Sequence, residues 1–156
     1  MDRETLAEAV HAVARQTGSR AERAQRLANL IRASTGRRWV GVYEVARRQV
    51  VNLAWSGPSA PAYPSFPVGE GLTGAAIETR ESILSNDVTN DPRYLTALAS
   101  TGSELIVPIV IGAGVVGTLD VEDERSDAFD TDDQRLFERA ASAMGPLFVE
   151  WPTAAA

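Results

Sequence analysis

The sequence predicts an α+β domain in which helices from both ends of the chain pack on a mostly antiparallel sheet. Apolar residues recur at helical spacing near both ends, while runs rich in β-branched and aromatic residues fill the middle. Turn signals separate these runs into hairpins, and the strict alternation of strand and helix that marks a doubly wound sheet is missing. The length of 156 residues suits one domain with a full hydrophobic core.

The first two elements are expected to be helices over residues 3–16 and 21–34. Gly18 and Ser19 interrupt the apolar pattern between them, and Gly36 stands where a glycine commonly ends a helix. The pattern therefore predicts two successive helices rather than one long helix.

A β-hairpin and a long loop are expected next. Two β-rich runs flank residues 46–49, which predicts a hairpin with its turn at that point. Four prolines lie within residues 56–67, and this segment is expected to be neither strand nor helix. A loop of this length is commonly functional or mobile.

A glycine-rich segment leads into a short helix expected over residues 75–79 and a short strand over 82–85. Residues 94–101 are expected to make one or two helical turns. Three glycines favour tight packing, although their N–H groups could also bind an anion at a helix N-terminus: Gly69, Gly71 and Gly74.

A second hairpin and a final helix complete the chain. The apolar runs 104–111 and 115–122 are expected to pair as strands through the turn at 112–114. Asp130 is expected to cap the last helix, and Pro146 to kink or end it.

Composition excludes several classes of function. The chain contains no cysteine, which removes disulfides, thiolate nucleophiles and cysteine-ligated metals. His11 is the single histidine, so a site with several histidine ligands cannot form. The acidic run 120–133 lacks the spacing of an EF-hand and reads as a solvated loop. We therefore expect no metal, no cofactor and no thiol catalysis.

The charge and hydropathy of the chain exclude two kinds of partner. Its 21 acidic residues outnumber its 15 basic residues, all of which are arginine, so non-specific binding to nucleic acid is not expected. No apolar run approaches the roughly 20 residues of a membrane span. The first residues lack the apolar stretch of a signal peptide. We expect a cytoplasmic protein that binds neither nucleic acid nor membrane.

Strand alternation gathers polar and aromatic side chains on one face of the expected sheet. Trp39 and Tyr43 share a face of the first strand, and Glu104 points to one face of a later strand. Asp120 and Glu122 share a face of the last strand. The residues between them are apolar, so each strand has one face for the helices and one mixed face where a polar site could form.

Carboxylates inside apolar strands need a partner, because a lone buried charge is costly. Glu104 and Asp120 either contact a ligand or are satisfied by an arginine or by backbone amides. Two converging carboxylates favour a cationic group such as an amine. Trp39 and Tyr43 are either core aromatics or walls of the same pocket. Tyr94, which follows a turn signal, is expected to cap a cavity that segments 56–67 and 86–101 close.

Three strings carry a family resemblance. PVGEGLTGAAIETRESILSNDVTNDPRY, SELIVPIVIGAGVVGTLDVEDE and FDTDDQRLFERAA together resemble a GAF domain over residues 20–150. The resemblance implies about six antiparallel strands, with the N- and C-terminal helices on one face and a ligand pocket on the other. Within that family the chain is most similar to the free methionine-(R)-sulfoxide reductases, through WVGVY, GEGLTG, SELIVP and GTLDVE.

The resemblance also implies roles for pocket residues. It implies that Trp39 and Tyr43 line the pocket. It implies that three acids hold the amino group of a substrate: Glu104, Asp120 and Glu122. The cysteines of those enzymes fall on other residues in this chain: Tyr63, Thr73 and Ala97. The thiolate is the nucleophile of that chemistry. The resemblance therefore implies the ligand pocket but not the reductase reaction.

We therefore expect a small-molecule-binding GAF sensor or regulatory domain without thiol catalysis, whose ligand is an amino acid or another amine-bearing metabolite. Two alternatives stay open: a reductase-like enzyme, and a dimerising interaction module with a vestigial pocket. Residues 1–18 are expected to form an N-terminal helix that could contact a second copy, residues 19–150 the domain, and residues 151–156 a disordered tail. A homodimer through the terminal helices is expected because several apolar residues extend beyond the core pattern: Leu6, Val10, Val13, Leu147 and Phe148.

Overall fold

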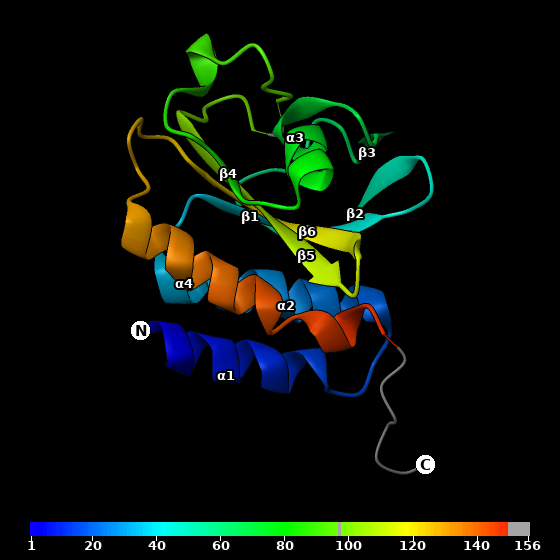
Figure 1. The fold of residues 1–156 in the computed structure, drawn as a ribbon. Coiled ribbons are helices and arrows are strands. Elements are labelled where there is room, and N and C mark those ends of the chain that lie inside the picture. Colours follow the sequence, from blue (N-terminus) through cyan, green and yellow to red (C-terminus); the bar gives the residue numbers. More distant parts are fainter. Residues whose placement is uncertain (97, 150–156) are drawn as a thin grey trace.

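The computed structural model describes residues 1–96 and 98–149 and contains one antiparallel sheet of six strands (Figure 1). The strand order is β3-β2-β1-β6-β5-β4, which confirms the expected α+β class. In chain order the elements are α1 (Arg3–Ala14), α2 (Arg20–Thr35), β1 (Trp39–Val45), β2 (Gln49–Ser56), β3 (Ser65–Pro67), α3 (Gly71–Thr79), β4 (Ile83–Ser85), η1 (Val88–Asn90), β5 (Ser103–Ile111), β6 (Gly114–Asp123), α4 (Thr131–Ser142) and η2 (Gly145–Leu147).

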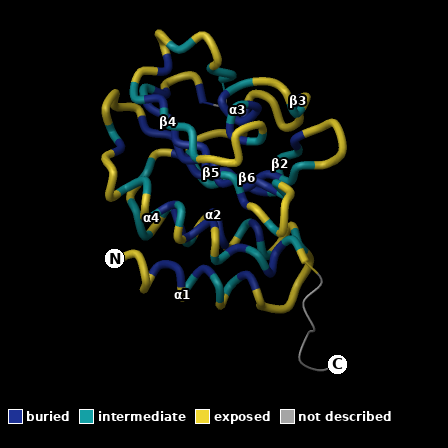
Figure 2. Tube along the Cα trace, in the orientation of Figure 1, coloured by how far each residue is buried: buried dark blue, intermediate teal, exposed yellow. Residues whose placement is uncertain are grey.

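The terminal helices cover one face of the sheet, as expected. Helices α2 and α4 lie against the strands, and α1 packs across these two helices as an outer layer (Figure 1). Alternate residues of the central strands supply the sheet side of this core, among them Val42, Leu105 and Leu119. Buried residues run through the sheet and the helices that cover it, while the loops on the opposite face of the sheet are mostly exposed (Figure 2).

The terminal helices bury their apolar residues within a single chain. Leu6 and Val10 are 0% exposed and Leu147 is 1% exposed, while Val13 and Phe148 are partly buried against the same core. The premise that these residues extend beyond the core was wrong, because α1 packs on both α2 and α4 and all five residues belong to the core or pack against it within one chain. Gly18, between α1 and α2, has a φ of +118°, and the expected division of the chain at residue 18 stays a prediction.

The caps expected at Asp130 and Gly36 are observed, whereas α4 ends four residues before Pro146, where the sequence placed its end or kink. Ser19 and Asp130 cap α2 and α4, and each side chain accepts a hydrogen bond from a backbone N–H three residues later. Gly36 ends α2 with a φ of +69°. Helix α4 ends at Ser142, and Pro146 lies in the short 3-10 turn that follows.

The proline-rich segment contains a strand that the sequence did not predict. Residues Ser65–Pro67 form β3 and pair with Gln49–Val51 of β2. Prolines are tolerated there because β3 is a short edge strand whose outer side needs no backbone donor. Phe66, at its centre, is 8% exposed and anchors the strand.

Two further elements differ from expectation. Helix α3 begins at Gly71 rather than at residue 75, and it needs glycine at Gly74, where a Cβ atom would lie 2.6 Å from the Gly69 backbone. Among the described residues of 94–101 there is no helix. Leu98 is buried with the aromatic cluster around Tyr43, so tertiary contacts replace local helical bonds there. Ala97 and the tail at 151–156 lie outside the described residues.

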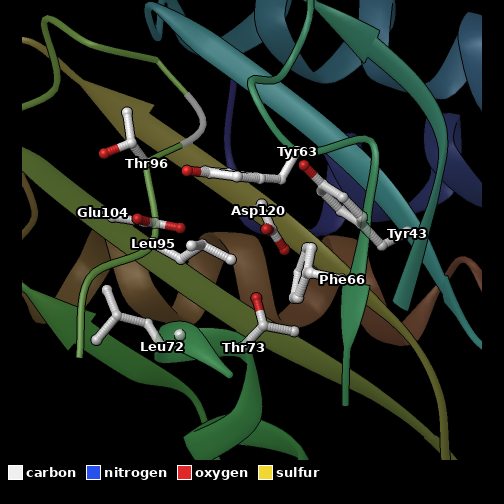
Figure 3. Close-up of a pocket in the computed structure, with 10 residues that line it drawn as sticks. Tyr43, Tyr63, Phe66, Leu72, Thr73, Leu95, Thr96, Glu104 and Asp120 are labelled. Atoms are coloured by element: carbon white, nitrogen blue, oxygen red, sulfur yellow. The ribbon is translucent and has the colours of Figure 1, made fainter. Parts of the chain in front are cut away.

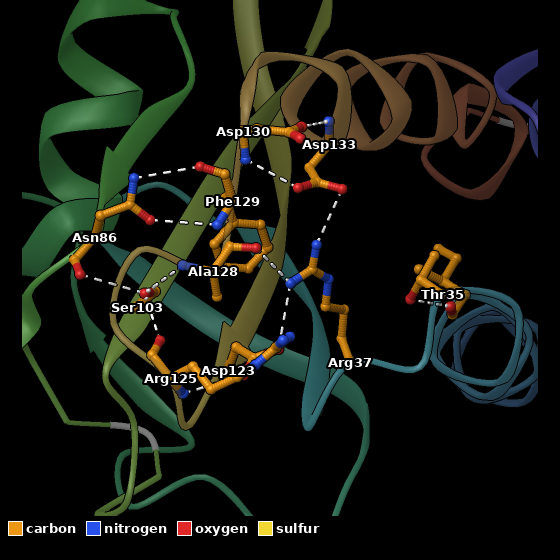
Figure 4. A network of polar contacts seen from close by, with 11 residues as sticks. Thr35, Arg37, Asn86, Ser103, Asp123, Arg125, Ala128, Phe129, Asp130 and Asp133 are labelled. Carbon is orange, nitrogen blue, oxygen red and sulfur yellow. Dashed lines mark hydrogen bonds and ion pairs between the residues drawn. The ribbon is translucent and has the colours of Figure 1, made fainter.

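Arg37, two residues before β1, holds three separate parts of the fold together (Figure 4). Its Nη1 donates to the Ala128 carbonyl oxygen at 2.8 Å and lies 3.2 Å from Asp123 Oδ2. Its Nη2 lies 3.0 Å from Asp133 Oδ1 on α4. The guanidinium also lies over the Phe129 ring, 4.3 Å from the centroid. One buried cation therefore joins β1 to the end of β6 and to the start of α4.

Replacing this cation should destabilise the fold strongly. Arg37→Met leaves the buried Asp123 carboxylate with Arg125 but without Arg37 and also breaks the pair with Asp133, and we expect a loss of about 2 kcal/mol in the free energy of unfolding. The matched control is Arg38→Met, because Arg38 pairs with Glu124 at the surface, where side chains are 41% and 50% exposed. That control should cost less than about 1 kcal/mol. Guanidinium unfolding of both variants measures the difference, and equal losses would contradict this account.

Candidate functional site

The register of the central strands brings the predicted site residues to the face opposite the terminal helices. Tyr43 of β1 lies opposite Thr118 of β6, and Glu104 of β5 lies opposite Glu122 of β6. Asp120 lies between these pairs along β6. All of these side chains therefore point to the side of the sheet that α3 and the long loops cover (Figure 1).

A small cavity lies on this face, between the sheet, α3 and two loop segments. Figure 3 shows the carboxyl groups of Glu104 and Asp120 among the surrounding aromatic rings. The cavity leaves about 20 Å³ for the centre of a water molecule, which is room for about one water. A metabolite therefore enters only if a loop segment moves. The lining residues are Tyr43, Tyr63, Phe66, Gly71, Leu72, Thr73, Leu95, Thr96, Glu104 and Asp120.

Five of the eight predicted site residues line this cavity, and the other three lie outside its lining. Tyr94 and Glu122 contact each other, with 3.1 Å between the Tyr94 hydroxyl and Glu122 Oε1. Trp39 is 0% exposed, and its indole N–H donates to the Ser59 carbonyl oxygen at 3.0 Å. Trp39 thus anchors the proline-rich segment that closes the cavity. The five lining residues are Tyr43, Tyr63, Thr73, Glu104 and Asp120.

The remaining lining residues come from segments without a regular hydrophobic pattern. Phe66 lies on the unpredicted edge strand, and its ring meets Tyr43 edge-to-face with centroids 5.9 Å apart. Leu95 and Thr96 lie on the loop after η1, and Leu72 lies on the first turn of α3. The segments 56–67 and 86–101 were expected to close a cavity, but no periodicity in the sequence marks which of their residues turn inward.

The acidic groups of this face have few hydrogen-bond donors. The Thr118 hydroxyl donates to Asp120 Oδ1 at 2.8 Å, and the Tyr94 hydroxyl can donate to Glu122 Oε1. Glu104 Oε2 and Glu122 Oε2 are buried and have no hydrogen-bond partner among residues 1–96 and 98–149. Glu104 and Asp120 are each 4% exposed, and Glu122 is 0% exposed. Three carboxyl groups are thus withdrawn from water with most of their acceptor capacity unused.

Burial raises the pKa of all three carboxyl groups. Burial, together with repulsion from Glu122 and Asp120, raises the pKa of Glu104 well above its usual range. Burial also raises the pKa of Asp120 well above its usual range, although the hydrogen bond from Thr118 opposes this effect. The pKa of Glu122 rises to about 7, chiefly through burial. The site therefore keeps protons that exposed carboxylates would lose below neutral pH.

No arginine within the described ranges forms an ion pair with these acids. Arg93, on the nearby loop, is engaged by Asp91, with 2.9 Å between Nη2 and Oδ2. An internal arginine was one of the partners considered for Glu104 and Asp120. No arginine in this part of the chain pairs with either acid. No set of three or more histidine, aspartate or glutamate side chains in residues 1–96 and 98–149 is arranged to hold a metal ion.

The raised pKa values predict that stability falls with pH across the neutral range. The folded protein holds protons that the unfolded chain releases above about pH 4.5, so their contribution is complete below that pH and is lost as pH rises through the folded pKa. Each such group changes the free energy of unfolding by about 1.4 kcal/mol for each pH unit in this window. Guanidinium unfolding at several pH values between about 5 and 8 measures this slope.

Glu122→Gln should flatten the slope, because the variant has no proton to lose at this position. The matched control is Glu124→Gln, which changes a half-exposed acid just beyond β6 and should leave the slope as in the wild type. A wild-type protein whose stability does not change across this pH range would show that the buried acids are not protonated.

Comparisons with known proteins agree with this architecture. A family model described as the GAF domain matches residues 2–148. The chain is 29% identical over 106 residues to the free methionine-R-sulfoxide reductase of Saccharomyces cerevisiae, a match that covers 66% of this chain and 58% of that protein. It is 26% identical over 98 residues to GAF domain-containing protein A of Dictyostelium discoideum, covering 62% of this chain and 61% of that protein.

The chain thus spans about six-tenths of the length of these curated relatives. Among solved structures, the free methionine-R-sulfoxide reductase of Neisseria meningitidis, in complex with its substrate, gives a TM-score of 0.83 at 22% identity. That match covers 94% of this chain and 87% of the other, and at this identity it shows the fold alone. No helix of the described residues is both long and apolar enough to cross a membrane. Because the family model covers nearly the whole chain, the chain belongs to the GAF domain family.

Proposed function

We propose that this chain is a GAF sensor domain whose cavity binds the ammonium group of a small metabolite, such as an amino acid, without thiol catalysis. The observation that carries the proposal is the set of buried acids without a basic partner in the described part of the chain. Buried charges in proteins are normally paired, and a site that keeps unpaired acids favours a cationic ligand.

The chemistry of the cavity suits an ammonium group on an apolar body. An ammonium has three donors and no acceptor, which matches acids that only accept hydrogen bonds when ionised. One pair of opposite charges at about 4 Å contributes on the order of 4 kcal/mol at an effective dielectric of about 20, before desolvation is subtracted. The rings of Tyr43, Tyr63 and Phe66 add faces that attract a cation, and Leu72 and Leu95 add apolar contact.

Reductase activity is the second candidate, since proteins similar to this chain carry that name. A thiolate is the nucleophile in the chemistry that the resemblance implies, and the chain has no cysteine. Tyr63 and Thr73, which stand where the resemblance places two of the cysteines, both line the cavity. A phenol and a secondary alcohol keep the shape of a pocket without supplying that nucleophile, which favours binding over reduction.

Three small molecules of similar shape separate the role of the ammonium from that of the carboxylate. L-methionine carries both groups, 3-(methylthio)propylamine carries only the amine, and 4-(methylthio)butanoate carries only the carboxylate. We expect the first two to raise the melting temperature of the protein and the third to leave it unchanged. Stabilisation by the carboxylate-only compound alone would overturn the proposal. Turnover of methionine sulfoxide with a thiol donor, above the rate without protein, would establish the reductase instead.

Removing one acid should weaken binding of the amine. We expect Glu104→Gln or Asp120→Asn to reduce the affinity for 3-(methylthio)propylamine more than tenfold, or about 1.4 kcal/mol, because each variant removes one attractive charge. Titration calorimetry measures the change. Glu70→Gln is the matched control, because Glu70 is exposed before α3 and should leave affinity unaltered. Equal affinities for all four proteins would place the amine elsewhere.

The expected homodimer through the terminal helices and the expected cytoplasmic location stay predictions. Since Leu6, Val10 and Leu147 are covered within one chain, a dimer would use the outer surface of α1 or α4. Sedimentation at tens of micromolar tests this assembly, and we expect twice the mass of one chain. A mass of one chain would remove both the dimer and the alternative of a dimerising interaction module.

A further inference from the structure

Two of the buried acids face each other directly across the sheet. Glu104 of β5 and Glu122 of β6 are register partners in an antiparallel pair. Partners of this kind place their Cβ atoms about 4.5–5.5 Å apart on one face of a sheet, and like charges directly opposite are destabilising. Both side chains are almost completely buried, so water does not screen the repulsion. Ionising both groups together is therefore costly.

Each of the two acids also has one buried oxygen without a donor. These atoms are Glu104 Oε2 and Glu122 Oε2. Two ionised carboxylates cannot satisfy each other, because both only accept hydrogen bonds. A single proton held between them gives one group a hydroxyl donor and the other an acceptor role. One proton thus turns one of the two acceptors into a donor and removes most of the repulsion between the groups.

The groups that face this pair from neighbouring elements supply no positive charge. Asp120 follows along β6, and Tyr43 on β1 is held neutral because burial and the three acids raise its pKa. Ser85 of β4 lies opposite Glu104. From the loop after η1, the Tyr94 hydroxyl reaches Glu122, while Asp91 adds a negative charge near Glu104.

The arginine on that loop is already committed to another acid. Arg93 Nε and Nη2 lie 3.1 Å and 2.9 Å from the two oxygens of Asp91. Neither Arg93 nor any other basic side chain in the described part of the chain pairs with Glu104 or Glu122. A proton is thus the cation that remains for this pair when no ligand is bound.

We propose that Glu104 and Glu122 share one proton in the ligand-free protein at neutral pH, and that an entering ammonium group displaces it. The displaced proton passes to the solvent buffer, and the ammonium N–H groups then donate to the two carboxylates. Ligand affinity therefore rises with pH until the pair is ionised without the ligand. The shared proton is inferred from the register and burial of Glu104 and Glu122. Its displacement by an ammonium group rests in addition on the proposed function.

A titration of the ligand-free protein tests the shared proton. The full chain is labelled with ¹³C at the glutamate carboxyl groups, and the NMR shifts are followed from acid to alkaline pH. We expect one of the two buried groups to lose its proton only near or above neutral pH, well above the pKa of about 4.3 that glutamate has in model peptides. Two buried groups that both ionise near the model-peptide value would overturn the proposal.

Variants show whether the proton belongs to the pair. In Glu122→Gln the opposing charge is gone and an amide donor replaces it, so we expect the midpoint of Glu104 to fall by at least about one pH unit. Glu104→Gln should lower the midpoint of Glu122 in the same way. Glu124→Gln is the matched control and should change neither. An unchanged midpoint in both pair variants would overturn sharing, and the wild-type titration still decides the matter if a variant does not fold.

Calorimetry tests displacement separately. Binding of 3-(methylthio)propylamine at neutral pH is measured in buffers that differ in their heat of ionisation. We expect release of about one proton per amine bound in the wild-type protein and close to none in Glu122→Gln. Binding without proton release would overturn displacement. Absence of binding would overturn the proposed function together with displacement, while the ligand-free titration would still decide the shared proton.

Discussion

The register of β1, β6 and β5 is the constraint on which both the core and the candidate site depend. It sends alternate residues to the terminal helices and the intervening residues to the cavity. Glycine is required where this arrangement crowds the backbone. A Cβ atom at Gly41 would lie 2.4 Å from the Trp39 ring and 3.0 Å from Tyr43, so glycine leaves space for both aromatic side chains on one strand. A slip of one residue would exchange the two faces entirely.

Two neighbouring acids of β6 show how differently the two faces treat a carboxyl group. Asp123 lies on the side of Arg37, and hydrogen bonds from Arg125 and Arg37 lower its pKa even though burial opposes them. Glu122 points the other way and forms no ion pair with a described residue, and burial raises its pKa to about 7. The first arrangement is typical of an acid that holds a structure together. The second is typical of an acid at a functional site.

The small cavity and the buried acids are linked through the loop segments that line the cavity. With space for about one water, the cavity cannot hold a metabolite unless the loop segments move. Tyr63, which is 49% exposed, stands on the proline-rich segment that Trp39 anchors through Ser59. Tyr94 holds the second segment by its contact with Glu122. Under the proposed function, a ligand that engages Glu122 would compete with this contact, which would couple binding to movement of this loop segment.

The sequence by itself determined the layers of the fold, because period and turn signals are local properties of the chain. It also placed Tyr43, Glu104 and Asp120 on one face, since alternation along a strand depends only on parity. The tertiary structure decided which loop residues turn inward, because no local pattern in segments 56–67 and 86–101 specifies that. Only the tertiary structure shows that Trp39 lies outside the cavity lining and holds the proline-rich segment through Ser59. Only the tertiary structure shows that α1 packs on α2 and α4. Contacts between residues distant in sequence depend on how whole elements pack, and a single sequence does not encode that in any local pattern.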